Sequence, residues 1–251
     1  MKMRHNKFTL VELLVVICIA SLLMGVVLPA FNRMVTGSAV DRLASNLKLR
    51  LERAQSHAAS SRRHVALLLP QGDVSNNWSD EERVVKAALG GSRMCYVDDV
   101  KTEGSPEEYS SEFKRWIPDE DWVQPERGAL LVAISAEDPV DNNGNLKTSG
   151  IEYIAHNGAV TGTIIQGTGK NKPLKKTTKV IFVESSATEK AVADSAIIFS
   201  PKGGIRSTSD LYLVIAEAMI NDGKVIYPGG ELHNFRVLKV NRLTGKVEYH
   251  R

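Results

Sequence analysis

The chain has 251 residues, of which 43% are hydrophobic and 24% are charged, a balance that argues against a wholly disordered protein. Its formal charge is +3, and Lys2, Arg4 and Lys7 carry three positive charges, so residues 8–251 are neutral overall. A nucleic-acid-binding surface is therefore not predicted, because such surfaces carry a concentrated basic patch.

The first segment is a short basic leader, residues 1–7, followed by an apolar run over residues 8–31. The run is close to the ~20 residues that a transmembrane helix needs, and longer than the core of a signal peptide. Because the basic residues precede the run, the positive-inside rule places Met1 in the cytoplasm and the chain beyond Phe31 across the membrane. The prediction is a single-pass anchor that presents a large domain.

One carboxylate, Glu12, lies near the start of this run. An ionisable side chain inside hydrocarbon costs about 2.5 to 3.5 kcal/mol at mid-helix, so its presence indicates a function, such as pairing with a cation. The simpler alternative is a carboxylate at a helix N-terminus, where the helix dipole stabilises it by about 0.3 to 1 kcal/mol.

Residues 8–14, with the sequence FTLVELL, resemble the start of type IV pilins and type II secretion pseudopilins. In that family a prepilin peptidase cuts just before the phenylalanine and methylates the new amine, so the resemblance places the cut between Lys7 and Phe8. Glu12 matches the glutamate that pairs with the amine of a neighbouring subunit, and Pro29 matches the proline that kinks the helix. The family usually has glycine before the cut, where this chain has Lys7.

The resemblance also implies partners and a location. The partners are other pilin or pseudopilin subunits, the prepilin peptidase and an assembly platform in the inner membrane. The location is the cytoplasmic (inner) membrane, with the C-terminal domain in the periplasm, and later the assembled filament. The residues themselves predict no cofactor, no metal and no catalytic residue.

Residues 32–63 are predicted to continue as an amphipathic helix, because apolar side chains recur at steps of mostly three and four. These side chains are Val35, Val40, Leu43, Ala44, Leu47, Leu51, Ala54 and Ala58. The basic residues opposite them are interpreted as a solvated face, with contact to partner subunits as the alternative; they are Arg42, Lys48, Arg50, Arg53 and Arg62. Residues 49–56 and 62–67 resemble the H-type minor pseudopilins.

Residues 64–251 are predicted to form a β-rich globular domain, because short strand-like segments alternate with turn residues. The predicted strands are 65–69, 93–97, 129–134, 151–154, 160–165, 179–183, 196–199, 211–216, 235–240 and 246–249. Residues 101–127 are mainly loop, apart from a strand around Trp116. The predicted fold class is α+β: a long N-terminal helix, membrane-spanning in its first half and amphipathic in its second, packed on a C-terminal antiparallel β-sheet domain.

Signatures of catalysis are sparse in this chain. No phosphate-binding loop, nucleophile elbow or zinc-protease motif occurs, and Cys18 and Cys95 are poorly placed to pair. A tight turn is the main interpretation of residues 141–144, with a calcium site built on Asp138 and Asp141 as the alternative. The predicted function is a filament subunit rather than an enzyme. A membrane-tethered periplasmic enzyme or ligand-binding domain with a pilin-like anchor is the competing hypothesis.

Overall fold

The computed structural model describes residues 10–69, 89–101, 109–147, 150–151, 153–157, 180–182, 191–193, 196–207, 209–222 and 224–250. Side chains are described at these positions except at 26–37, 99–101, 109–110, 112, 180–182 and 191–193. Lys7, Phe8 and the predicted strand at 160–165 lie outside the described residues.

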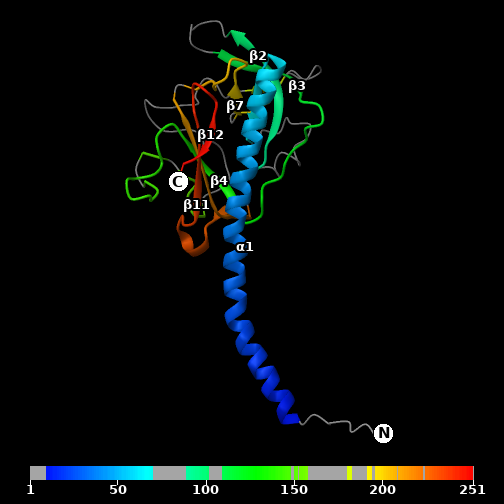
Figure 1. Cartoon of the computed structure of the whole chain (residues 1–251), viewed down its shortest axis with the longest axis vertical. Helices are drawn as coiled ribbons and strands as arrows, with labels where there is room; N and C mark the ends of the chain where they lie inside the picture. The colour runs from blue at the N-terminus through cyan, green and yellow to red at the C-terminus, as the bar shows by residue number, and fades with distance from the viewer. Residues whose placement is uncertain are drawn as a thin grey trace, which may run out of the picture.

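The first element is the helix α1 (Leu10–Ser61), whose N-terminal part extends beyond the sheets (Figure 1). Its side chains are described in two stretches, residues 10–25 and 38–61. The helix ends at Ser61 because Arg62 has a φ of 55°, the left-handed conformation that commonly terminates an α-helix. The chain then enters the first strand almost at once.

Six strands form the first sheet, in the order β6-β5-β3-β2-β1-β7. They are β1 (His64–Leu68), β2 (Arg93–Lys101), β3 (Tyr109–Trp116), β5 (Val180–Phe182), β6 (Ala191–Ala193) and β7 (Ala196–Phe199). Neighbouring strands are antiparallel, except that β3 and β5 run parallel. Because β1 pairs with both β2 and β7, segments far apart in the sequence lie side by side.

A second, fully antiparallel sheet has the order β12-β11-β8-β4. Its strands are β4 (Ala129–Ser135), β8 (Leu211–Glu217), β11 (Phe235–Val240) and β12 (Val247–Tyr249). A separate two-stranded hairpin consists of β9 (Met219–Asn221) and β10 (Lys224–Ile226), and the short 3-10 helix η1 (Pro228–Gly230) follows it.

One face of the second stretch of α1 packs across both sheets. The buried side chains of this face are Ala39, Val40, Leu43, Ala44, Leu47, Leu51, Ala54 and Ala58. They share a cluster with Leu67 and Phe199 of the first sheet and with Leu213 and Leu238 of the second. Small alanine side chains let the strands approach the helix closely, so this cluster is the main core of the molecule.

The opposite faces of the two sheets are buried as well. Side chains alternate along a strand, so Ala66 and Leu68 of β1 point away from α1 and enter a second cluster that contains Cys95 and Trp122. The corresponding face of the second sheet forms a third cluster, which includes Tyr227. Both sheets therefore bury apolar side chains on both of their faces.

Most of the predicted strands are confirmed. Those at 65–69, 93–97, 129–134, 179–183, 196–199, 211–216, 235–240 and 246–249 correspond to β1, β2, β4, β5, β7, β8, β11 and β12. The predicted strand at 151–154 is wrong, since its described residues form no strand and Ile151 packs against the third cluster from a loop. The strand predicted around Trp116 is confirmed as β3, which occupies residues 109–116 and pairs with β2.

The predicted fold class is wrong as stated. The prediction was a long helix, membrane-spanning in its first half, packed on one antiparallel sheet domain. Among the described residues no helix qualifies as a membrane span. The described strands, nearly all paired antiparallel, form a six-stranded sheet, a four-stranded sheet and a two-stranded hairpin rather than one antiparallel sheet.

The predicted location across the cytoplasmic membrane is contradicted too. Within the described residues, no helix has both the length and the apolar character needed to cross a bilayer.

Replacing Leu47 by alanine is expected to lower the free energy of unfolding by about 2 to 5 kcal/mol, because this side chain is 1% exposed in the main core. Leu49 lies on the same helix and is 63% exposed, so Leu49→Ala should change the free energy by less than about 0.5 kcal/mol. Urea unfolding of both variants measures the difference. Equal effects would contradict the described orientation of α1.

Candidate functional site

The N-terminal stretch of α1, residues 10–25, is named here the apolar stretch. Every residue in it is exposed. Its large hydrophobic side chains are Leu10, Val11, Leu13, Leu14, Val15, Val16, Ile17, Ile19, Leu22, Leu23 and Met24, with exposed fractions between 47% for Val15 and 81% for Leu10. Since they occupy consecutive positions of a helix with 3.6 residues per turn, they cover all of its sides.

A helix with an apolar surface exposed in this way is unusual in a folded protein. A helix that is hydrophobic all round is typically buried in a larger core, and large exposed apolar patches mark sites of interaction. The apolar stretch is therefore the candidate functional site of the molecule.

Glu12 lies in the first turn of α1 and is the acidic residue of the apolar stretch. Its position places the carboxylate where the helix dipole favours negative charge. Pro29 lies within the bounds of α1, but its side chain is outside the described part of the chain. The predicted processing residues, Lys7 and Phe8, lie outside it altogether.

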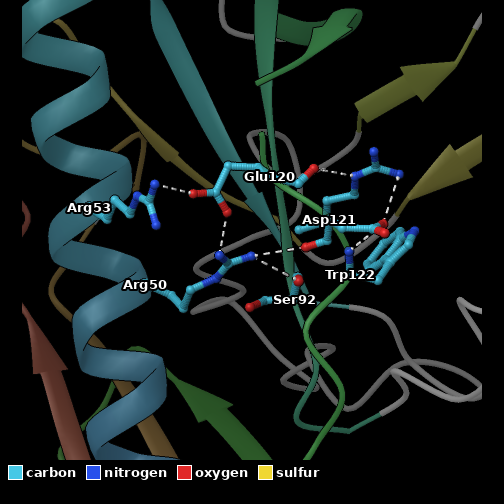
Figure 2. A network of polar contacts seen from close by, with 7 residues as sticks. Arg50, Arg53, Ser92, Glu120, Asp121 and Trp122 are labelled. Carbon is cyan, nitrogen blue, oxygen red and sulfur yellow. Dashed lines mark hydrogen bonds and ion pairs between the residues drawn. The ribbon is translucent and has the colours of Figure 1, made fainter. Parts of the chain in front are cut away.

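A second feature fixes α1 to the rest of the molecule and is named here the polar ladder. It consists of four side chains on one side of the helix, spaced by four, four and three residues: Arg42, Asn46, Arg50 and Arg53. All four contact carboxylates of the segment 117–126, named here the strap. Figure 2 shows Arg50 and Arg53 reaching from the helix toward Glu120.

Glu120 is the centre of the ladder. Its side chain is only 2% exposed and forms ion pairs with both arginines: Arg50 donates a hydrogen bond to Oε2, and Arg53 Nη2 lies 2.8 Å from Oε1. Arg50, itself 11% exposed, also donates from Nη2 to the carbonyl oxygens of Ser92 and Asp121, each at 3.3 Å. The buried carboxylate is thus matched by a buried guanidinium with several acceptors, as a buried charge requires.

The contacts that Arg42 and Asn46 make with Glu126 are more exposed. Glu126 of the strap accepts from Arg42 Nε at 3.4 Å through Oε2 and from the side-chain amide of Asn46 at 3.2 Å through Oε1. Arg42 is 52% exposed, so this pair is screened by water and contributes less than the Glu120 pair.

The strap is held from its other side by the first sheet. Ser92 and Val123 exchange backbone hydrogen bonds at 3.0 and 3.1 Å. Arg93 donates from Nε to the carbonyl of Glu120 at 3.2 Å, and its guanidinium carbon lies 3.9 Å from the centre of the Trp116 ring. The strap therefore connects α1 to β2 and β3 through polar contacts on both of its sides.

The polar ladder differs from the sequence interpretation of these residues as a solvated face. Arg50 is mostly buried, and Arg42, Arg50 and Arg53 all contact the strap. The spacing of these arginines on one helix side was visible in the sequence. The sequence did not show which carboxylate pairs with Arg50, because Glu120 is 70 residues away along the chain.

The acidic loop after β4 is a network of local hydrogen bonds. Asp138 Oδ1 accepts from the Val140 amide at 2.9 Å, and Oδ2 lies 2.8 Å from His250 Nε2. Asp141 Oδ1 accepts from the amides of Asn143 and Asn145, both at 2.8 Å, which supports the turn interpretation. No group of three or more His, Cys, Asp or Glu side chains is placed to hold a metal ion among the residues that the structure describes.

Both cysteines are free thiols. Cys18 is exposed within the apolar stretch, whereas Cys95 is completely buried on β2. Burial raises the pKa of the Cys95 thiol far above its ordinary value, although the charge of Arg93 opposes the shift. Cys95 therefore stays protonated and behaves as a small core side chain.

Replacing Glu120 by glutamine is expected to lower the free energy of unfolding by about 3 kcal/mol, because Arg50 would keep its buried charge without a counter-ion. Glu126→Gln is the matched control, since it removes the same charge from the exposed end of the strap and should cost less than about 1 kcal/mol. Chemical unfolding measures both values. If Glu126→Gln lowered the free energy of unfolding as much as Glu120→Gln does, the central role of Glu120 would be contradicted.

Asp138 generates a pH-dependent prediction. Burial raises the pKa of Asp138, but the hydrogen bonds from the Val140 amide and His250 outweigh it and hold the pKa below its ordinary value of 3.8. A carboxyl group with a lowered pKa stabilises the fold above its unfolded pKa, and this stabilisation is lost as the pH falls through the folded pKa. Asp138→Asn should therefore lower the melting temperature near neutral pH, and the melting temperatures of the two proteins should converge once the pH falls below the lowered pKa of Asp138.

Thermal unfolding followed across this pH range provides the measurement. A difference between the wild-type protein and Asp138→Asn that stayed constant down to the lowest pH would contradict the role given to the carboxylate charge. The hydrogen bond between His250 and Asp138 provides a second test. In a His250→Gln background, Asp138→Asn should lower the melting temperature near neutral pH by less than it does in the wild-type protein.

Comparisons of the chain with protein-family models, with curated proteins and with solved structures find no match. The role of α1 is therefore inferred from the exposure and the contacts of its own side chains.

Proposed function

We propose that this chain is a pilin-like (pseudopilin) subunit that enters a filament of a type II secretion or type IV pilus system. It assembles through its N-terminal helix after processing by a prepilin peptidase. The observation that carries this proposal is the exposure of the apolar stretch on all sides of α1.

The hydrophobic effect provides the driving force for assembly. Removing apolar surface from water contributes roughly 25 cal/mol per Å², so covering side chains such as Leu10, Leu22 and Met24 favours association. One helical neighbour covers only one side of a helix, because side chains interdigitate along a single line of contact. Several neighbours are needed to cover the whole circumference, as in a bundle of many copies.

Glu12 fits this bundle if a cation meets it there. A carboxylate surrounded by apolar side chains is costly unless it is paired. The α-amine that processing creates has an unperturbed pKa of about 7.7 to 8, and it is cationic at neutral pH. The resemblance of residues 8–14 to the pilin motif supplies such an amine at Phe8 of an adjacent copy.

The polar ladder supports the same role from the other end of α1. Filament assembly through a helix positions the attached domain only if helix and domain move together. Arg50 and Glu120 make that connection with a buried ion pair, beside the apolar packing of the main core. The domain can then present its surface at a defined angle to the bundle.

Glu12→Ala is expected to leave the domain folded and to reduce incorporation into filaments, because the amine of the adjacent copy loses its partner. Glu12→Gln keeps the size and polarity of the side chain and should show the same defect, which isolates the charge. Ser21→Ala is the matched control within the apolar stretch, where the hydroxyl donates only to the carbonyl of Ile17 at 2.8 Å. Incorporation is measured by quantifying the subunit in purified filaments.

The N-terminus of each variant is determined by mass spectrometry in the same experiment. Processed chains that begin at a methylated Phe8 are expected for all of them. Unchanged incorporation of Glu12→Ala and Glu12→Gln would refute the role of Glu12, and a functional wild-type protein with an intact Met1 would refute the processing step.

A further inference from the structure

The turn in the loop after β4 contains an asparagine directly followed by a glycine, Asn143 and Gly144. This pair of residues can react with itself. The main-chain nitrogen of glycine loses its proton and attacks the side-chain carbonyl carbon of asparagine, and the side-chain nitrogen gains a proton and leaves as ammonia. Water then opens the five-membered imide to aspartate or isoaspartate. Glycine favours the attack because it has no side chain to hinder the nitrogen or to restrict the backbone.

The side chain of Asn143 is free to take part in this reaction. Asn143 is exposed, and its side-chain amide makes no hydrogen bond to any residue that the structure describes. The described contacts therefore do not hold its carbonyl carbon away from Gly144. Any restraint on the reaction has to come from the main chain of the turn.

The attacking nitrogen, in contrast, is held in place. The Gly144 amide donates to the main-chain carbonyl of Asp141 at 3.1 Å. This hydrogen bond stabilises the protonated amide, which does not attack, and it has to break before the nitrogen can approach the Asn143 side chain. Gly144 has a φ of 85°, a conformation that favours glycine, so the turn itself requires the reactive pair of residues.

The residues on both sides of Gly144 are held by the side chain of Asp141. Its Oδ1 accepts from the amides of Asn143 and Asn145, both at 2.8 Å. The Asp141 amide also donates to the carbonyl of Asn145 at 2.8 Å. A single aspartate thus closes the turn with its side chain, its carbonyl and its amide, as aspartates commonly do in turns.

We propose that Asn143 is a site of spontaneous deamidation and that the Asp141 side chain slows the reaction. The reaction requires a local opening that frees the Gly144 nitrogen, and the two hydrogen bonds to Asp141 Oδ1 make that opening rarer. The product carries a new carboxylate beside Asp141. Isoaspartate also adds one methylene to the main chain, so the loop whose Asp138 contacts His250 cannot close in the same way.

The rate of deamidation is measured by incubating the full-length chain at neutral pH and analysing its peptides by mass spectrometry. Asp141→Ala is expected to raise the rate at Asn143 about tenfold, because two hydrogen bonds that keep the turn closed are lost. Asp141→Asn keeps an oxygen acceptor at the same position and should stay within about twofold of the wild-type rate. This pair of variants separates the hydrogen bonds from the charge.

Asn157, which Gly158 follows in the sequence, is the reference within each molecule because it lies outside the turn. Its rate should be the same in the wild-type protein and in both variants. Equal acceleration of Asn143 and Asn157 in Asp141→Ala, or no acceleration of Asn143, would overturn the local role of Asp141. A rate in Asp141→Asn as high as in Asp141→Ala would overturn the role of the side-chain acceptor.

The wild-type chain unfolded in urea provides a comparison that depends on no variant. Asn143 should deamidate there at least about tenfold faster than in the folded chain, because all the hydrogen bonds of the turn are lost. Equal rates in the folded and unfolded chains would overturn the protection. Absence of the reaction in the unfolded chain would overturn the site itself.

Discussion

The alanine- and leucine-lined face of α1 fills the space between the two sheets, and the positions of the other elements follow from that contact. β1 and β7 of the first sheet and β8 and β11 of the second all contact the helix. Because both sheets use the same helix face, neither sheet has a complete core without it. The domain therefore depends on the second stretch of α1 as much as the helix depends on the domain.

The polar ladder restricts how α1 can rotate and shift against the sheets. Apolar contacts tolerate small rotations and shifts, whereas an arginine and a carboxylate need a specific geometry. A buried ion pair contributes little net stability compared with well-packed apolar side chains, because both charges lose their water. The pair between Arg50 and Glu120 is better understood as fixing how far α1 is rotated about its own axis relative to the strap.

The parts of the structure that could be predicted are those where apolar side chains recur at a regular spacing along a short segment of the chain. Leu43, Leu47 and Leu51 recur at the helical step and are buried together, and β11 and β12 lie at the predicted strands 235–240 and 246–249. The Glu120 pair could not be predicted, because no local pattern connects a loop carboxylate to a helix 70 residues away.

The four contacts of the polar ladder are arranged in a line along the helix axis, and this has a mechanical consequence. A force applied along α1 loads all four contacts and the apolar face at once, in shear. A force across the helix would instead separate them one after another, as in unzipping. Traction on the N-terminal end of α1 is therefore resisted by the sum of these contacts, and the sheets move with the helix as one body.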